Sequence, residues 1–466
     1  MATCQPRDLP TRVLAHADRA GCTDTAITAR AHTGHALSTH SSASHALLAP
    51  RASACPGLAR IVPARDGGLC RIRLMGGELS AAAAHAVADA AARHASGVIE
   101  VTNRANLQLR GVRDDGIVAL LLDAGLGPAT PSADDIRNVM LSPIASDETR
   151  ALAAQIVDGM QRDTRLHALS PKFALLVDGG ERLAMLDHPH DIWFASMDDG
   201  ERFAFGLAGC PVDMPIGAVG RAQVVALAAA LLHAFIDFAA PEQARMRDLL
   251  DTLPLDQLLG ALDVPFTRDV RTWRHAAADP SLRLGAHFQA GDASMYVGAQ
   301  PPLGRLTVSN LHALAHLAAS KGSGILQMTP WQSVLLPGIA HDDAPAVLDT
   351  LQSLGLATDA SDPLARLIAC AGSPGCGRSQ ADTKADALQL AQRLPAHAGE
   401  VHLSGCTRSC AAAHRVENTL LAVAPGRYDL YQHAMQPDAS HFGRCVAHNI
   451  TIEEAADWLA RSTTDA

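Results

Sequence analysis

Two distant stretches of the sequence are copies of one another. Residues 77–111 align with residues 304–338 without a gap, at a constant offset of 227, and 12 of the 35 aligned positions are identical. Alanine accounts for some of these matches. Glycine is more informative, because it marks special backbone positions, and Gly111 recurs as Gly338. Such a long interval indicates duplication of a whole domain pair rather than a solenoid of short repeats.

Each copy has the pattern of one helix followed by two short strands. Ser80 and Thr307 have the chemistry of helix N-caps, and Gly97 is expected to end the first helix. Strands are expected at about 98–102 and 106–112. The unit is of α+β type and too small to bury a core comfortably alone. We therefore expect the two copies to pair about a pseudo-twofold axis.

The two copies differ in the side chains that one strand face presents. Alternation along 106–112 places polar groups on one face: Asn106, Gln108 and Arg110. The second copy has mostly apolar residues at the same places: Ser333, Leu335 and Pro337. Trp331 replaces Arg104. A large, flat, anionic ligand between the halves would use both surfaces.

Four of the ten cysteines fall within 41 residues, spaced as C-x5-C, 29 residues and C-x3-C: Cys370, Cys376, Cys406 and Cys410. Zinc sites usually space paired cysteines two to four apart, and thiolates also hold iron–sulfur clusters. Neighbouring glycines such as Gly375 and Gly405 let the backbone approach a bulky group. Unconnected cysteines and zinc stay open as alternatives, and a 4Fe–4S cluster is the favoured interpretation.

Composition excludes several classes of protein. The 466 residues carry a net charge of −10 and no Lys/Arg-rich run, so no nucleic-acid partner is expected. The longest apolar run, about Val224–Leu232, is shorter than the ~18 residues of a membrane span and predicts a buried helix without membrane contact. Residues 1–50 are interpreted as a disordered extension, with a transit peptide as the alternative, and a cytoplasmic location is expected.

The cysteine spacing, in a chain whose duplicated half carries Thr102-Asn103-Arg104 before a strand, resembles the nitrite/sulfite reductase family. The resemblance covers roughly residues 52–463. It implies an α+β fold of two pseudo-twofold-related halves, each a ferredoxin-like half-domain plus a larger α/β domain that binds the cluster and tetrapyrrole. The implied domains are 51–116 and 281–345 for the half-domains, 117–280 for the first larger domain and 346–463 for the cluster-bearing one.

The resemblance also implies roles for individual residues. The four clustered cysteines become ligands of a 4Fe–4S cluster, with Cys410 nearest the macrocycle. In the reductases of the family this last cysteine also bridges to a sirohaem iron. Arginines and a lysine on the family's motifs are implied to act on the substrate: Arg104, Arg137 and Lys172. Further residues are implied to bind the tetrapyrrole: Arg71, Arg73, Asn106, Gln108 and Arg110.

Within the family, segments 53–77, 297–307 and 329–338 resemble an oxygen-dependent branch that acts in aerobic cobalamin synthesis. That branch hydroxylates precorrin-3A and closes a lactone, using dioxygen and electrons from NADH or another donor. The reductase pattern has a second lysine two residues after Lys172, where this chain has Ala174. Loss of that cation disfavours reduction of an oxyanion, which needs concentrated positive charge.

Two alternatives remain at this point. One is a sirohaem-dependent assimilatory sulfite or nitrite reductase, and the other is a non-catalytic cluster or zinc protein that senses redox state or carries electrons. The oxygen-dependent branch is also associated with a mononuclear non-haem iron. His188 and His190, with carboxylates on either side, are candidate ligands of the two-His-one-carboxylate kind.

Overall fold

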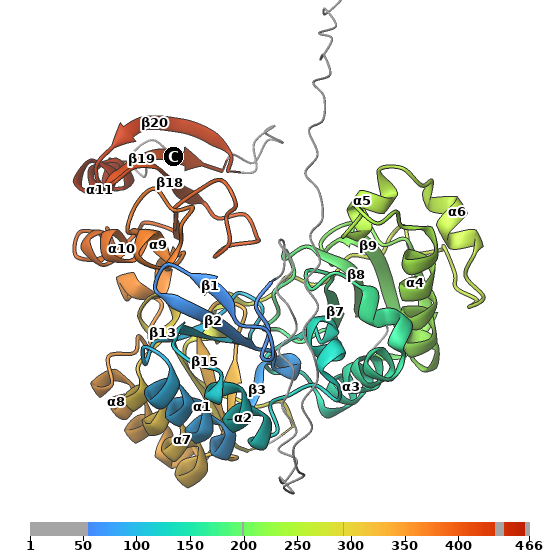
Figure 1. Cartoon of the computed structure of the whole chain (residues 1–466), viewed down its shortest axis with the longest axis horizontal. Helices are drawn as coiled ribbons and strands as arrows, with labels where there is room; N and C mark the ends of the chain where they lie inside the picture. The colour runs from blue at the N-terminus through green and yellow to red at the C-terminus, as the bar shows by residue number, and fades with distance from the viewer. Residues whose placement is uncertain (1–54, 198–199, 292, 434–441, 462–466) are drawn as a thin grey trace, which may run out of the picture. The chain divides into compact units, whose positions relative to one another are not determined.

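The computed structural model describes residues 55–197, 200–291, 293–433 and 442–461 (Figure 1). The extension expected at 1–50 lies outside the described residues. The chain divides into two units, Met1–Ala46 and Leu47–Ala466, and everything below concerns the second. Because Leu47–Ala466 forms one compact unit, the finer domain boundaries stay a prediction.

The duplicated segments build two five-stranded sheets. The first has the order β1 (Val62–Ala64), β2 (Gly67–Ile72), β5 (Leu107–Val112), β4 (Ile99–Val101) and β13 (Arg305–Leu306). The second has the order β11 (Gly285–Phe288), β12 (Met295–Ala299), β15 (Val334–Ile339), β14 (Ile325–Met328) and β3 (Glu78–Ser80). The predicted strands of both copies are therefore present.

Each sheet takes its last strand from the other copy. In the first sheet, Arg305 of β13 lies opposite Glu100 of β4. In the second, Leu79 of β3 lies opposite Leu326 of β14. The two copies are therefore joined by reciprocal exchange of equivalent strands.

The helices of the two copies pack together beside these sheets (Figure 1): α1 (Ala81–His94), α2 (Gly116–Asp123), α7 (Val308–Lys321) and α8 (Ala344–Ser353). Ser80 caps α1 by accepting from the amide of Ala83, as predicted. Imidazole nitrogens of His85 and His312 lie 2.8 Å apart. Equivalent residues can touch only near the axis that relates their copies, so the pseudo-twofold axis passes between these rings.

The backbone repeats even where it is strained. Ala105 and Gln332, equivalent at the offset of 227, have φ values of 54° and 63°. Non-glycine residues rarely adopt this left-handed conformation. Thr102 Oγ1 accepts from the amide of Asn106 in the first loop, and Thr329 Oγ1 accepts from the amide of Ser333 in the second. One loop design therefore connects β4 to β5 and β14 to β15.

The remaining residues form two mixed sheets with the same internal order. The first contains β6 (Val139–Leu141), β7 (Leu175–Asp178), β8 (His190–Met197), β9 (Arg202–Gly209) and β10 (Gly217–Gly220). The second contains β16 (Leu367–Ala369), β17 (Val401–Ser404), β18 (Asn418–Ala424), β19 (Arg427–Gln432) and β20 (Arg444–Ile450). The first three strands of each are parallel and the last two antiparallel. The duplication therefore extends over both larger domains.

Helices accompany these two sheets. The first sheet has α3 (Asp147–Arg162), α4 (Val224–Phe238), α5 (Met246–Leu250) and α6 (Leu255–Gly260), and the second has α9 (Gly372–Gly375), α10 (Thr383–Ala391) and α11 (Ile452–Arg461). Separate apolar cores lie beneath them. These cores hold the loops that follow the parallel strands.

Among the described residues, one helical run, Arg221–Phe238, is long and apolar enough to cross a membrane. This run is longer than the apolar stretch recognised in the sequence. Core helices pass the same test, and Leu227, Leu231 and Phe235 of this run are buried in the core shared with α3. Because 39% of the run is buried, the structure agrees with the interpretation of a buried helix for one face only.

Candidate functional site

The four clustered cysteines lie in two loops at one edge of a sheet. Cys370 comes directly after β16, and Cys406 and Cys410 come after β17. Because β16 and β17 are adjacent and parallel, their carboxyl ends meet at the same edge. The amide of Gly405 donates to the sulfur of Cys370 at 3.3 Å and joins the two loops. All four cysteines are free thiols.

The four thiols lie close enough to influence one another. Desolvation, followed by the proximity of the other three cysteines, raises the pKa of Cys410. Four cysteines are a ligand set both for a structural zinc ion and for a 4Fe–4S cluster.

Buried cations from both halves support the cysteine loops. Arg110 donates to the carbonyl oxygen of Gly375 at 2.9 Å and pairs with Asp66 at 2.7 Å and Glu100 at 3.4 Å. Lys384 donates to the carbonyl of Ala369, directly before Cys370, at 3.0 Å. Burial lowers the pKa of Lys384 to about 8. Both cations are held by internal partners. Their hydrogen bonds to backbone carbonyl oxygens support the cysteine loop from the protein interior.

The two strained hairpin loops also contact the cysteine loops. Asn103 Nδ2 donates to the carbonyl oxygen of Cys410 at 3.3 Å. Gln332 Nε2 donates to the carbonyl of Ala411 at 3.1 Å. Equivalent loops of the two copies therefore hold the last cysteine loop from two sides.

Two arginines near this loop carry positive charge that the protein leaves largely unbalanced. Burial, followed by the charge of Arg73, lowers the pKa of Arg71 to about 10, and its Nε has no hydrogen-bond partner. Burial, followed by the charges of Arg245 and Arg71, lowers the pKa of Arg104 to about 10. Crowded guanidinium groups of this kind favour an anionic ligand.

The other predicted cations are already paired. Arg73 is buried against Asp134 and Asp135, at 3.6 Å and 3.4 Å, and donates to Asn138 at 3.1 Å. Arg137 pairs with Asp134 at 3.3 Å, and its Nε has no partner. Both arginines therefore pair with carboxylates and each keeps one nitrogen without a hydrogen-bond partner, Nη1 in Arg73 and Nε in Arg137.

The predicted amide side chains, those of Asn106 and Gln108, both make internal hydrogen bonds. Asn106 Oδ1 accepts from the amide of Leu74 at 2.8 Å. Gln108 accepts from Arg71 at 2.8 Å and donates to Glu100 at 3.1 Å. Gln108 and Arg110 on this face therefore share a hydrogen-bond network through Glu100. This network orients Arg71, whereas Asn106 separately holds the backbone of Leu74.

A small, partly open pocket is lined by several predicted residues. Its lining includes Arg104, Asn106, Arg137, Ala174 and His190. Lys172 is exposed beside it, and its carbonyl oxygen accepts from Arg104 at 3.4 Å. The structure thus brings the expected arginines and Ala174 together while leaving the Lys172 side chain exposed.

The candidate iron ligands are buried neutral histidines. The rings of His188 and His190 lie 5.1 Å apart, and each Nδ1 has no hydrogen-bond partner. Burial lowers the pKa of His190 to about 3, and burial together with His190 lowers that of His188 well below its usual value. Neutral imidazoles are the form that binds metal. Asp191, one flanking carboxylate, is instead held by Arg245 at 2.9 Å.

Sequence reasoning missed several charged residues of this region. Arg245, Asp134 and Lys384 come from segments with no motif, and only the fold brings them to the site. A second small pocket is lined by Trp331 and Gln332 together with His414 and Glu400. No periodicity or spacing in the sequence points to these partners.

Comparisons with known proteins agree with this architecture. The family model described as "Nitrite/Sulfite reductase ferredoxin-like half domain" matches residues 62–123 and 287–354, the two exchanged copies. The solved structure of the NirA protein of Mycobacterium tuberculosis superposes with a TM-score of 0.71 at 22% identity, covering 84% of this chain and 80% of that one. The chain belongs to the nitrite/sulfite reductase family.

Curated relatives in this family fall into two groups. A chloroplastic ferredoxin–nitrite reductase of Zea mays is 29% identical over 68% of this chain and 62% of its own length. A precorrin-3B synthase of Sinorhizobium sp is 25% identical over 82% of both chains. This chain spans about three fifths of the length of the first plant reductases that it matches. The comparisons favour neither reaction.

Proposed function

We propose that this chain is a precorrin-3B synthase: it hydroxylates precorrin-3A with dioxygen and closes a lactone on the product. The observation that carries the proposal is the lining of the small, partly open pocket, which includes Ala174 together with Arg104 and Arg137. The resemblance places a second lysine there in the reductases. An apolar methyl group removes a cation that an oxyanion substrate would use.

The number and placement of the four cysteines support a 4Fe–4S cluster. They are free thiols, and they lie in the loops after two adjacent parallel strands. The amide of Gly405 already donates to one sulfur, as amides do around clusters. We propose Cys370, Cys376, Cys406 and Cys410 as the ligands. When bound, the cluster would supply electrons one at a time, which suits chemistry with dioxygen.

The cationic residues would bind and orient the substrate. The resemblance implies a tetrapyrrole that carries eight carboxylates, and guanidinium groups bind carboxylates in a bidentate manner. Arg104 and Arg71 have few internal partners and lowered pKa values, so a carboxylate would relieve their mutual repulsion. Arg137 would add a donor from the same pocket through its unpartnered Nε.

The overall reaction needs two electrons besides dioxygen. One oxygen atom enters the product as a hydroxyl group and the other leaves as water, with NADH or another donor supplying the electrons. A mononuclear iron stays a prediction, supported by the unpartnered Nδ1 atoms of His188 and His190.

The deciding experiment is anaerobic binding of precorrin-3A to cluster-loaded protein, followed by air and reductant. We expect formation of the hydroxylated lactone, detected by mass spectrometry as incorporation of one atom from ¹⁸O₂. Protein that has an intact cluster and binds precorrin-3A but forms no lactone would refute the proposal.

The second candidate is a sirohaem-dependent nitrite or sulfite reductase, favoured by relatives such as the Zea mays enzyme. In that case the tetrapyrrole is a cofactor rather than the substrate. Sirohaem absorption bands in the purified protein, together with turnover of nitrite or sulfite, would establish this function. The same cysteines and arginines would then serve the bound cofactor.

A further inference from the structure

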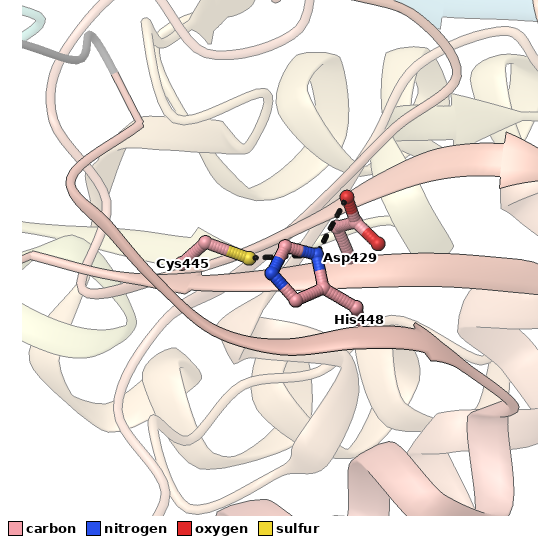
Figure 2. A group of neighbouring side chains, drawn as sticks. All are labelled: Asp429, Cys445 and His448. Carbon is pink, nitrogen blue, oxygen red and sulfur yellow. Dashed lines mark hydrogen bonds and ion pairs between the residues drawn. The ribbon is translucent and has the colours of Figure 1, made fainter.

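A second group of metal-ligating side chains lies away from the four clustered cysteines. Asp429, Cys445 and His448 present their donor atoms within 4.8 Å of one another on β19 and β20 (Figure 2). Cys445 Sγ lies 3.5 Å from His448 Nδ1, and the same nitrogen lies 3.3 Å from Asp429 Oδ2. Three different donors therefore converge on one point.

The backbone of β20 is distorted in a way that produces this convergence. In a regular strand, residues three apart such as Cys445 and His448 would point to opposite faces. The register to β19 shifts twice along this stretch, between Tyr428 and Leu430 and between Leu430 and Tyr431. Bulges of this kind re-aim side chains.

A strained residue accompanies the bulges. Asn449 has a φ of 52°, and its amide donates to Asp429 Oδ1 at 2.9 Å. This bond fixes one carboxylate oxygen and leaves Oδ2 directed at His448. Left-handed residues that the surrounding structure holds in place concentrate at functional sites.

Two of the three donor separations fit one tetrahedral ion, and the third lies within 4.8 Å. Zn–S bonds of about 2.3 Å and Zn–N bonds of about 2.0–2.1 Å at tetrahedral angles separate sulfur and nitrogen by about 3.5 Å. The corresponding nitrogen–oxygen separation is about 3.3 Å. Both values match the distances between the side chains of Cys445, His448 and Asp429.

A catalytic thiol explains the arrangement less well. In a Cys–His–Asp relay, the thiol and the carboxylate contact different nitrogens of the imidazole ring. Here both contact Nδ1, so no proton could pass through the ring between them. Thiolate, imidazole and carboxylate together are instead a ligand set typical of zinc.

We propose that Asp429, Cys445 and His448 bind one Zn²⁺ ion, with a fourth coordination position open to solvent. The His448 side chain is 75% exposed, which gives the ion direct access from solvent. The site lies on an edge strand of the sheet that carries the clustered cysteines, and it does not depend on the proposed function.

The test uses full-length, cluster-loaded protein with one equivalent of Zn²⁺, followed by dialysis and X-ray absorption at the zinc edge. We expect a first shell of one sulfur and three nitrogen or oxygen atoms. Cys445→Ser should remove the sulfur contribution. Cys210→Ser is the matched control, because Cys210 also lies beside a carboxylate, Asp213, at 3.3 Å.

A competition titration with a chromophoric chelator measures affinity independently. His448→Ala should weaken Zn²⁺ binding by at least roughly tenfold, since even outer-shell partners of metal ligands contribute that much. His341→Ala is the control, because this exposed histidine also lies 3.3 Å from a carboxylate, that of Asp342. A four-sulfur shell, a shell without sulfur, loss of zinc on dialysis, or equal affinities of both variants would overturn the proposal.

Discussion

The guanidinium group of Arg110 donates a hydrogen bond of 2.9 Å to the carbonyl oxygen of Gly375, 265 positions later in the chain. Arg110 lies on β5 of the first copy, and Gly375 lies between the first two clustered cysteines. The same side chain pairs with Asp66 and Glu100. One residue of the first half therefore fixes the metal loop of the second.

Arg110→Met should destabilise the protein and disturb the cluster loop. The substitution removes the ion-pair partner of Asp66 and one partner of Glu100, which keeps Arg305 at 2.9 Å. The cost should therefore stay below the roughly 3–5 kcal/mol of breaking a fully buried ion pair. The free energy of unfolding in urea and the iron content per chain are the measurements. Arg162→Ala, which removes an exposed pair with Asp158, should cost less than about 1 kcal/mol. Equal effects of the two changes would contradict the role of Arg110.

Cys410→Ser should abolish the intact cluster. A 4Fe–4S cluster needs four thiolates, and a serine oxygen is a poorer ligand for iron of this kind. Iron and sulfide analysis should fall from about four of each per chain, and the visible absorption of the cluster should disappear. Cys70→Ser is a control, because Cys70 is buried in the core far along the chain from these loops. Unchanged cluster content in the Cys410 variant would refute the ligand assignment.

Arg104→Gln should weaken tetrapyrrole binding without unfolding the protein. A hydrogen bond to a charged group contributes about 1.5–3 kcal/mol, which corresponds to roughly 10–100-fold in affinity. Anaerobic titration with precorrin-3A, followed by absorbance, gives the dissociation constant. Arg93→Gln removes an exposed cation of α1 and serves as the control. An unaltered dissociation constant for the Arg104 variant would exclude this arginine from the binding site.

His275→Gln should change how stability depends on pH. Burial alone would lower the pKa of His275, but the hydrogen bond to Asp178 and its charge outweigh burial and raise that pKa above 6.5. The ion pair therefore stabilises the folded state fully below about pH 6.5, and this contribution is lost as pH rises through the raised pKa. Urea unfolding between pH 6 and 9 should show the loss in the wild type only. Parallel pH profiles of stability in the wild type and the His275 variant would contradict the role given to the ion pair of His275 and Asp178.

Much of the fold could be predicted because the sequence contains two copies of the same unit of one helix and two strands. The offset of 227 located both helices and their strands, and Ser80 caps its helix as its chemistry predicts. The exchange of β3 and β13 could not be predicted, because strand pairing between distant segments leaves no local pattern. Helix caps and short strands could be predicted from the local sequence, whereas the pairing of distant strands could not.

The candidate site was predicted unevenly for a similar physical reason. Residue type identified Arg73 and Arg110 as cations, but only the structure shows which carboxylates neutralise them. The zinc site proposed at Cys445 depends on strand bulges, which no sequence periodicity records. Composition and spacing identify candidate cations and metal ligands. The groups that pair with these residues are determined by the fold.

Reciprocal strand exchange has a consequence for how the chain folds. Glu100 acquires its neighbour Arg305 only after about two hundred further residues have been synthesised. Closing loops of that length costs entropy before any contact compensates for it, so the first sheet is completed late. Neither copy could have been lost after the duplication without leaving the other sheet with an open edge. Each copy therefore supplies the edge strand that completes the sheet of the other.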